Sequence, residues 1–208
     1  MFLLLVRSTL RSVARWLVVA SVCAVGAMPS ASPANARSDT ASAIPATPIG
    51  TPHDFDFEHG RWHTTLRRRV KPLSGSDVWA DYVGTTIVSP VLGGSANLAE
   101  LDVSGAEGRI RGLSLRLFDT RQRRWTLNFS NATAGTLAVP MTGGFGGSAR
   151  GVFYSAEEFG GRRILVRFII ESTGADTCRF EQAFSDDGGA TWETNWIAVD
   201  TRQDGKSK

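Results

Sequence analysis

Short, regularly spaced turn signals divide this chain from about residue 54 onward, and they constrain its fold more than any other feature. Between them, no segment shows helical periodicity over three or more turns. Glycine pairs and Ser-Gly or Asp-Thr steps favour tight reversals of the chain. They occur at Ser74-Gly75, Gly93-Gly94, Gly105 with Gly108, Asp119-Thr120, Gly135, Gly143-Gly144 with Gly146-Gly147, Gly160-Gly161, Gly174 and Gly188-Gly189. The sequence therefore predicts an all-β chain, a single up-and-down antiparallel barrel of about ten strands.

Period-two alternation supports several of these strands. The apolar sets are Leu113, Leu115 and Leu117, then Trp125, Leu127 and Phe129, then Ile164, Val166, Phe168 and Ile170. Because successive side chains point to opposite faces of a strand, we expect these sets to face inward and Arg116 and Arg167 to face outward. Closing the strands into a barrel removes the sheet edges that would otherwise promote aggregation.

The first 36 residues have the order of an export signal. Three arginines, at positions 7, 11 and 15, precede an apolar run, and Ala34-Asn35-Ala36 is a small-x-small cleavage site. The run is shorter than the roughly 20 residues of a membrane span. Residues 1–36 are thus predicted to be a signal peptide, and the mature chain an exported periplasmic or extracellular protein that is not inserted in a membrane. Cys23 lacks the small preceding residue expected at a lipid attachment site.

Charge and composition narrow the class of protein further. The chain carries 23 basic and 20 acidic residues, and residues 1–36 hold three arginines and no acid, so 20 of each remain after cleavage. A neutral chain gives no support to nucleic-acid binding. Only Cys178 remains, so no internal disulfide forms, and we expect a buried thiol. Residues 37–53 are predicted to be a flexible Ser/Thr/Ala/Pro linker, 54–202 the barrel of a monomer, and 203–208 a disordered tail.

Two motifs carry a family resemblance. The first is Phe55-Asp56-Phe57-Glu58-His59-Gly60-Arg61-Trp62, and the second runs from Ser185 to Trp196. Together with the strand count, they resemble a bacterial family of secreted proteins of uncharacterised function with a lipocalin-like, calycin-type barrel. The wider group includes lipocalins, fatty-acid-binding proteins and nitrobindins. The resemblance implies that Trp62, which follows Gly60, plugs one end of the barrel and that Arg202 packs across it.

The segment Ser185-x-Asp187-x-Gly189-x-x-Trp192 also matches the Asp-box pattern of sialidases and other carbohydrate-handling proteins. Its serine and aspartate oxygens accept backbone N–H bonds in a tight turn, the glycine allows a positive φ, and the tryptophan packs beneath the hairpin. A chain of this length cannot supply the several blades of a sialidase. We therefore interpret the segment as a structural hairpin rather than as a sugar site.

The predicted lumen supplies the candidate ligand site. Its candidate residues are Trp79, Glu100, Trp125, Tyr154, Phe168, Gln182 and Trp196. The main hypothesis is a barrel that binds a small, largely apolar molecule. One alternative is an isomerase, cyclase or lyase with Glu100 and Tyr154 as acid and base. Another is a carbohydrate-binding or structural envelope protein that exposes Trp192 and Trp196 as stacking platforms.

The histidines are the only metal candidates. His53, His59 and His63 lie close together at the start of the barrel, but their spacing matches no standard zinc pattern. No histidine follows His63, which disfavours a haem ligand inside the barrel. No cofactor is predicted, and Cys178 has no nearby histidine to activate it as a nucleophile.

Overall fold

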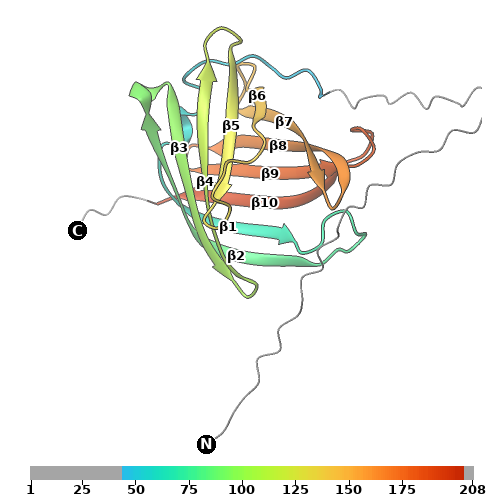
Figure 1. Ribbon diagram of the computed structural model, residues 1–208. Coiled ribbons are helices and arrows are strands. Elements are labelled where there is room, and N and C mark those ends of the chain that lie inside the picture. The colour runs from blue at the N-terminus through green and yellow to red at the C-terminus, as the bar shows by residue number, and fades with distance from the viewer. Residues whose placement is uncertain (1–43, 204–208) are drawn as a thin grey trace, which may run out of the picture. The chain divides into compact units, whose positions relative to one another are not determined.

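The computed structural model describes residues 44–203 and shows a closed barrel of ten antiparallel strands (Figure 1). The strands follow one another around the barrel in chain order, and the first pairs with the last. The predicted all-β meander is therefore confirmed. Two short 3-10 helices, η1 (Asp56–Glu58) and η2 (Leu92–Gly94), accompany the strands. The strands are β1 (Gly60–Arg69), β2 (Trp79–Val91), β3 (Ala96–Gly105), β4 (Gly108–Asp119), β5 (Arg124–Asn131), β6 (Met141–Gly144), β7 (Arg150–Phe159), β8 (Arg162–Gly174), β9 (Thr177–Ser185) and β10 (Glu193–Arg202).

The strand register decides which side chains face the interior. In β1, Trp62, Thr64 and Leu66 are buried and the residues between them are exposed. Directly opposite residues of antiparallel strands lie on the same face, and Thr64 pairs with Asp200 of β10 and Gly84 of β2. The alternation is less regular elsewhere: in β8, Ile164, Leu165 and Val166 are all buried. Figure 1 shows β3, β4 and β5 running across the direction of β8, β9 and β10, so the inward side chains of the two halves meet.

Aromatic side chains close the end of the barrel at which β1 begins. Phe55 lies just before η1, and its ring centre is 4.8 Å from that of Trp125, 5.0 Å from that of Phe145 and 6.0 Å from that of Phe153. The two closer pairs are edge-to-face, an arrangement that the charge distribution of aromatic rings favours. All four rings are buried. This end is packed shut, and we call it the closed end.

Trp62 and Arg202 join the first and last strands at the closed end. The guanidinium carbon of Arg202 lies 4.1 Å from the centre of the Trp62 ring, which is the arrangement that the resemblance implied. Arg202 also donates hydrogen bonds to the carbonyl oxygens of Phe57 and His59. Gly60 has a φ of 128°, and a Cβ there would lie 2.9 Å from Nη1 of Arg202. Glycine at this position therefore leaves room for the arginine to cross the ring.

The segment just before the barrel is not the flexible linker that composition predicted. Thr47 and Gly50 are buried against the start of β5. The Gly50 amide donates to the carbonyl of Arg123 at 2.7 Å, and Nε1 of Trp125 donates to the carbonyl of Thr51 at 2.9 Å. These backbone hydrogen bonds hold the segment in place despite its few large apolar side chains.

The predicted tail also begins one residue too early. The amide of Gln203 donates to the carbonyl of Arg61 at 2.9 Å, so Gln203 extends the pairing of β10 with β1. The predicted signal peptide, residues 1–36, lies outside the described residues. Within residues 44–203, no helix is long and apolar enough to span a membrane.

The outward placement predicted for Arg116 is wrong. Arg116 pairs in register with Asn97 and Leu127, and all three are buried. Leu113, of opposite parity, is 37% exposed on the outer face. The apolar alternation of β4 therefore points outward, because a buried carboxylate at Glu58 takes the arginine inside. Arg167 does face outward, with its guanidinium carbon 4.6 Å from the centre of the Trp192 ring.

The hairpin between β9 and β10 has the local bonding that the Asp-box pattern predicts. Ser185 Oγ accepts from the Gly189 amide at 2.8 Å and donates to Asp187 at 2.7 Å. Asp187 also accepts from the amide and hydroxyl of Thr191, and these hydrogen bonds lower its pKa to about 2. Trp192 packs against Arg167, and its Nε1 donates a hydrogen bond to the Gly189 carbonyl. Because its ring is engaged by Arg167, there is little support for Trp192 as a platform on which a sugar stacks.

Candidate functional site

Toward the end of the barrel away from η1, some inward side chains are partly exposed, although the inward Leu66, Tyr82 and Val103 stay buried there. Along β5, the inward residues pass from Trp125, which is fully buried at the closed end, to Phe129, which is 41% exposed. Along β4, the inward Ser114 is only half-buried. We call this half of the barrel, in which some inward residues near the rim are partly exposed, the accessible half.

Aromatic side chains form one wall of this accessible half. Phe168, Gln182 and Trp196 are consecutive cross-strand partners on β8, β9 and β10, and all three face inward and are half-buried. Phe168 stacks with Phe180, with ring centres 6.4 Å apart. We call Phe168, Phe180, Gln182 and Trp196 the aromatic wall.

A buried ion pair lies deeper in the barrel. Glu58 of η1 and Arg116 of β4 form a salt bridge, and their side chains are 1% and 5% exposed. The Arg116 guanidinium also lies over the Phe55 ring, 4.6 Å from its centre. Burial raises the pKa of Glu58 above its usual range, and the nearby Arg116 only partly opposes this. A buried ion pair of this kind holds two charges away from water at a substantial desolvation cost.

A second carboxyl group lies on the opposite half of the barrel. Asp200 of β10 is 3% exposed and is the register partner of Thr64, whose hydroxyl is 2.7 Å from that of Thr86. Burial raises the pKa of Asp200 to about 6, with a smaller contribution from Glu58, and the hydroxyls of Thr64 and Thr86 oppose the shift. Desolvation therefore outweighs the local hydrogen bonding.

Four atoms of these buried side chains have no hydrogen-bond partner among the described residues. They are Oε1 of Glu58, Oδ1 of Asn97, Nε of Arg116 and Oδ1 of Asp200. Buried polar atoms in proteins are nearly always hydrogen-bonded, so such a group requires an explanation. We call Glu58, Thr64, Thr86, Asn97, Arg116 and Asp200 the polar floor of the lumen.

Three of the predicted ligand residues lie outside the barrel. Trp79 is outward on β2, where Arg67 and Arg69 approach its ring at 5.4 and 5.1 Å. Glu100 is exposed on the outer face of β3, and Tyr154 is outward on β7 against Trp192. Their assignment to the lumen is wrong, because each lies one register position away from an inward residue. Glu100 and Tyr154 therefore form no acid–base pair inside the barrel.

The other predicted ligand residues do face the interior. Phe168, Gln182 and Trp196 belong to the aromatic wall. Trp125 is inward too, but it is completely buried at the closed end and its Nε1 is bonded to the Thr51 carbonyl. It therefore contributes to the packed core rather than to the accessible half.

The histidines do not gather into a metal centre. Nδ1 of His53 is 3.0 Å from the carboxylate of Asp56, while His63 is exposed on the outer face of β1. In the part of the chain that the structure describes, no three His, Cys, Asp or Glu side chains cluster as metal ligands would. Cys178 is buried, and burial raises its pKa to about 12, so the thiol stays protonated at neutral pH.

Sequence reasoning missed most of the polar floor, although one signal pointed to it. Asp200 has the same parity as Trp196, so an inward Trp196 on a regular strand implies an inward Asp200. Glu58 and Asn97 had no such signal, since nothing local distinguishes a buried polar side chain from an exposed one.

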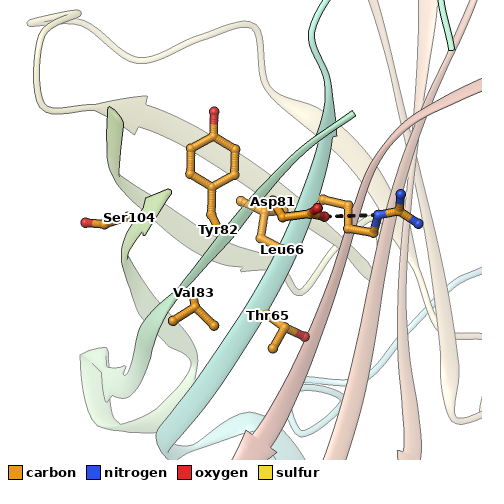
Figure 2. A pocket seen from close by; sticks show the side chains of 7 residues that line it. Thr65, Leu66, Asp81, Tyr82, Val83 and Ser104 are labelled. Atoms are coloured by element: carbon orange, nitrogen blue, oxygen red, sulfur yellow. Dashed lines mark hydrogen bonds and ion pairs between the residues drawn. The ribbon is translucent and has the colours of Figure 1, made fainter. Parts of the chain in front are cut away.

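A groove of about 410 Å³ lies outside the lumen, over β1 and β2 (Figure 2). Its outward residues include Thr65 and Val83, and the ion pair between Arg67 and Asp81 crosses it at 3.1 Å. No residue of the polar floor lines it. The unpartnered buried polar atoms of the polar floor, rather than this groove, make the barrel interior the candidate site.

Comparison with known proteins adds only distant structural likenesses. No model of a protein family and no curated protein matches the sequence. An S-type phycobiliprotein lyase from Guillardia theta is similar at 12% identity and a TM-score of 0.49, over 73% of this chain and 92% of that one. A redesigned β-barrel bound to DFHBI, mFAP0, is similar at 11% identity and a TM-score of 0.39, over 70% and 99%. We draw no functional conclusion from similarities at this level.

The raised pKa of Asp200 predicts that stability depends on pH. The folded-state pKa of Asp200, about 6, lies above its ordinary value of 3.8. Between these two pH values the folded protein therefore keeps a proton on Asp200 that the unfolded chain has lost. The contribution of Asp200 to the free energy of unfolding is complete below about pH 4 and falls as the pH rises through 6. The loss is at most about 3 kcal/mol, at about 1.4 kcal/mol for each pKa unit.

Urea denaturation between pH 4.5 and 7.5 measures this effect. The variant Asp200→Asn cannot ionise at this position and should show a smaller loss of stability as the pH rises. Identical pH profiles for the two proteins would show that Asp200 titrates normally in the fold.

Proposed function

We propose that this protein binds a small, largely apolar molecule in the lumen of its barrel, entering through the end away from η1. The observation that carries the proposal is the aromatic wall, where Phe168 and Trp196 face inward yet remain half-buried. Apolar surface left in water costs about 25 cal/mol per Å² relative to burial. A ligand that covers these rings recovers that free energy, as in other apolar pockets with a few polar groups.

The contrast between the two ends of the barrel supports this proposal. At the closed end, Phe55, Trp62, Trp125 and Phe153 are each at most 1% exposed, so their packing is complete. A barrel whose interior were purely structural would be filled in the same way along its length. Toward the other end, Phe129, Phe168 and Trp196 are instead left partly uncovered.

A fluorescent lipophilic probe tests the proposal. Nile red should bind the protein saturably, with the increase in emission that follows transfer to an apolar site. The inward variant Ser114→Trp fills part of the lumen and should weaken binding by roughly tenfold or more, which corresponds to about 1.4 kcal/mol. The adjacent outward variant Leu113→Trp is the control and should bind as the wild type does. Equal binding by both variants would place the probe outside the lumen.

We also propose that the chain is exported, as a member of the bacterial family of secreted lipocalin-like barrels that its motifs resemble. Support comes from the arginines, apolar run and Ala34-Asn35-Ala36 site of the leader. Mass spectrometry of the protein recovered from the exported fraction should give an N-terminus at Arg37 and the mass of a monomer with no attached lipid. A retained leader would contradict the cleavage site.

A further inference from the structure

The polar floor offers more hydrogen-bond acceptors than donors. Its atoms without a protein partner comprise three acceptor oxygens, on Glu58, Asn97 and Asp200, and one donor, Nε of Arg116. The side chains that carry them are each at least nine-tenths buried. A molecule that satisfies this set must supply mainly N–H or O–H groups.

The charges of the polar floor also favour a ligand that donates hydrogen bonds. Two carboxyl groups, Glu58 and Asp200, are accompanied by one guanidinium, Arg116, which the salt bridge with Glu58 already engages. Arg202 lies nearby in sequence, but its donors are directed to the carbonyls of Phe57 and His59 and to Asp176. A ligand carboxylate at this depth would meet acceptor oxygens and like charge, which disfavours it.

The aromatic wall and the polar floor share the inward face of β10. Trp196, Ala198 and Asp200 are successive inward positions of β10, with only the small Ala198 side chain between the ring and the carboxyl group. Four residues of strand span about 13 Å. Phe180, the register partner of Ala198, belongs to the same wall. An extended chain of about ten carbon atoms therefore covers the distance from the wall to Asp200.

We propose that the ligand is an apolar molecule whose polar end is an alcohol or an amine, with its apolar body along the aromatic wall. The single O–H of an alcohol donates to Asp200 or Asn97, and the N–H groups of an amine can donate to both. This inference rests on the proposed lumen binding and adds the chemical class of the ligand. Fatty acids, which have the same apolar body and an anionic end, are disfavoured by the polar floor.

Displacement of bound Nile red by three ten-carbon molecules tests the inference. At pH 7.5, decan-1-ol and decylamine should each displace the probe at concentrations about tenfold or more below that of decanoate, since decanoate leaves the buried acceptors without a donor. In Asp200→Leu this preference should fall to about twofold or less. Glu100→Leu removes an exposed carboxylate on the outer face and should leave the preference unchanged.

The outcomes separate the two proposals. If the wild type does not bind Nile red saturably, lumen binding itself fails. If Nile red binds but decanoate displaces it as well as decan-1-ol does, lumen binding stands and the ligand class proposed here is wrong. Asn97→Leu removes a second acceptor oxygen and should also reduce the preference, so the test remains decisive if Asp200→Leu does not fold.

Discussion

Replacing Trp62 by alanine is expected to lower the free energy of unfolding by about 3–5 kcal/mol, the usual range for removing a buried tryptophan. The ring is 1% exposed and lies at the closed end, where Arg202 covers it. Its Nε1 also donates to the carbonyl of Glu58 at 2.7 Å. The substitution therefore opens a cavity and removes the bond that holds η1 against β1. Equilibrium unfolding in urea measures the change directly.

The control is Arg202→Lys, which keeps the charge and the apolar stem but loses the planar group over the ring. A cation over an aromatic ring contributes about 0.5–2 kcal/mol, so the variant should be clearly less affected than Trp62→Ala. If the two variants lose the same stability, the closed end depends on the hydrogen bonds of Arg202 to Phe57 and His59 as much as on the tryptophan.

Replacing Arg116 by leucine is expected to destabilise the fold by about 3–5 kcal/mol at pH 8, because Glu58 must then either stay charged and buried without its partner or take up a proton at a cost in free energy. Removing both charges in Glu58→Leu with Arg116→Leu should restore most of this loss, since two apolar side chains need no desolvation. The pair of single variants and the double variant form a cycle that isolates the coupling between the two residues.

The pH dependence of the Arg116→Leu variant follows from the raised pKa of Glu58. Without the guanidinium, the main opposition to burial is removed and the folded-state pKa of Glu58 rises further above the unfolded value. Stability is then retained at pH values below the unfolded pKa, near 4, and is lost as the pH rises through the folded pKa. The variant should therefore be closest to the wild type near pH 4. A deficit that is the same at pH 4 and pH 8 would show that lost packing, rather than the buried charge, causes the destabilisation.

The strand count could be predicted from the sequence because each turn carries its own local signal. Ser74-Gly75 and Gly160-Gly161 adopt positive φ at the glycines, and the side chains of Ser185 and Asp187 bond to residues of their own hairpin. Such features depend on neighbouring residues in the chain. The same locality explains why the inward placement of Trp125 and Trp196 could be inferred from their own strands.

The prediction of side-chain direction failed in strands whose alternation did not show which face was the interior one. In β4 the leucines alternate as a core-facing strand would, yet they point outward because Arg116 pairs with Glu58, which is 58 residues earlier in the sequence. For Trp79, Glu100 and Tyr154, an error of one residue in the expected register reverses the face. The polar floor is built from η1, β1, β2, β3, β4 and β10, so only the closed barrel brings it together.

The indole N–H resonances of the tryptophans give the most direct test of lumen binding. In a titration of ¹⁵N-labelled protein with decan-1-ol, the resonance of Trp196, on the aromatic wall, should shift saturably. That of Trp79, which lies between Arg67 and Arg69 on the outer face, should not move. Assignment of each resonance follows from the variants Trp196→Phe and Trp79→Phe. A Trp196 resonance that stays unchanged up to the solubility limit of the alcohol, or one that moves no more than that of Trp79, would contradict binding in the lumen.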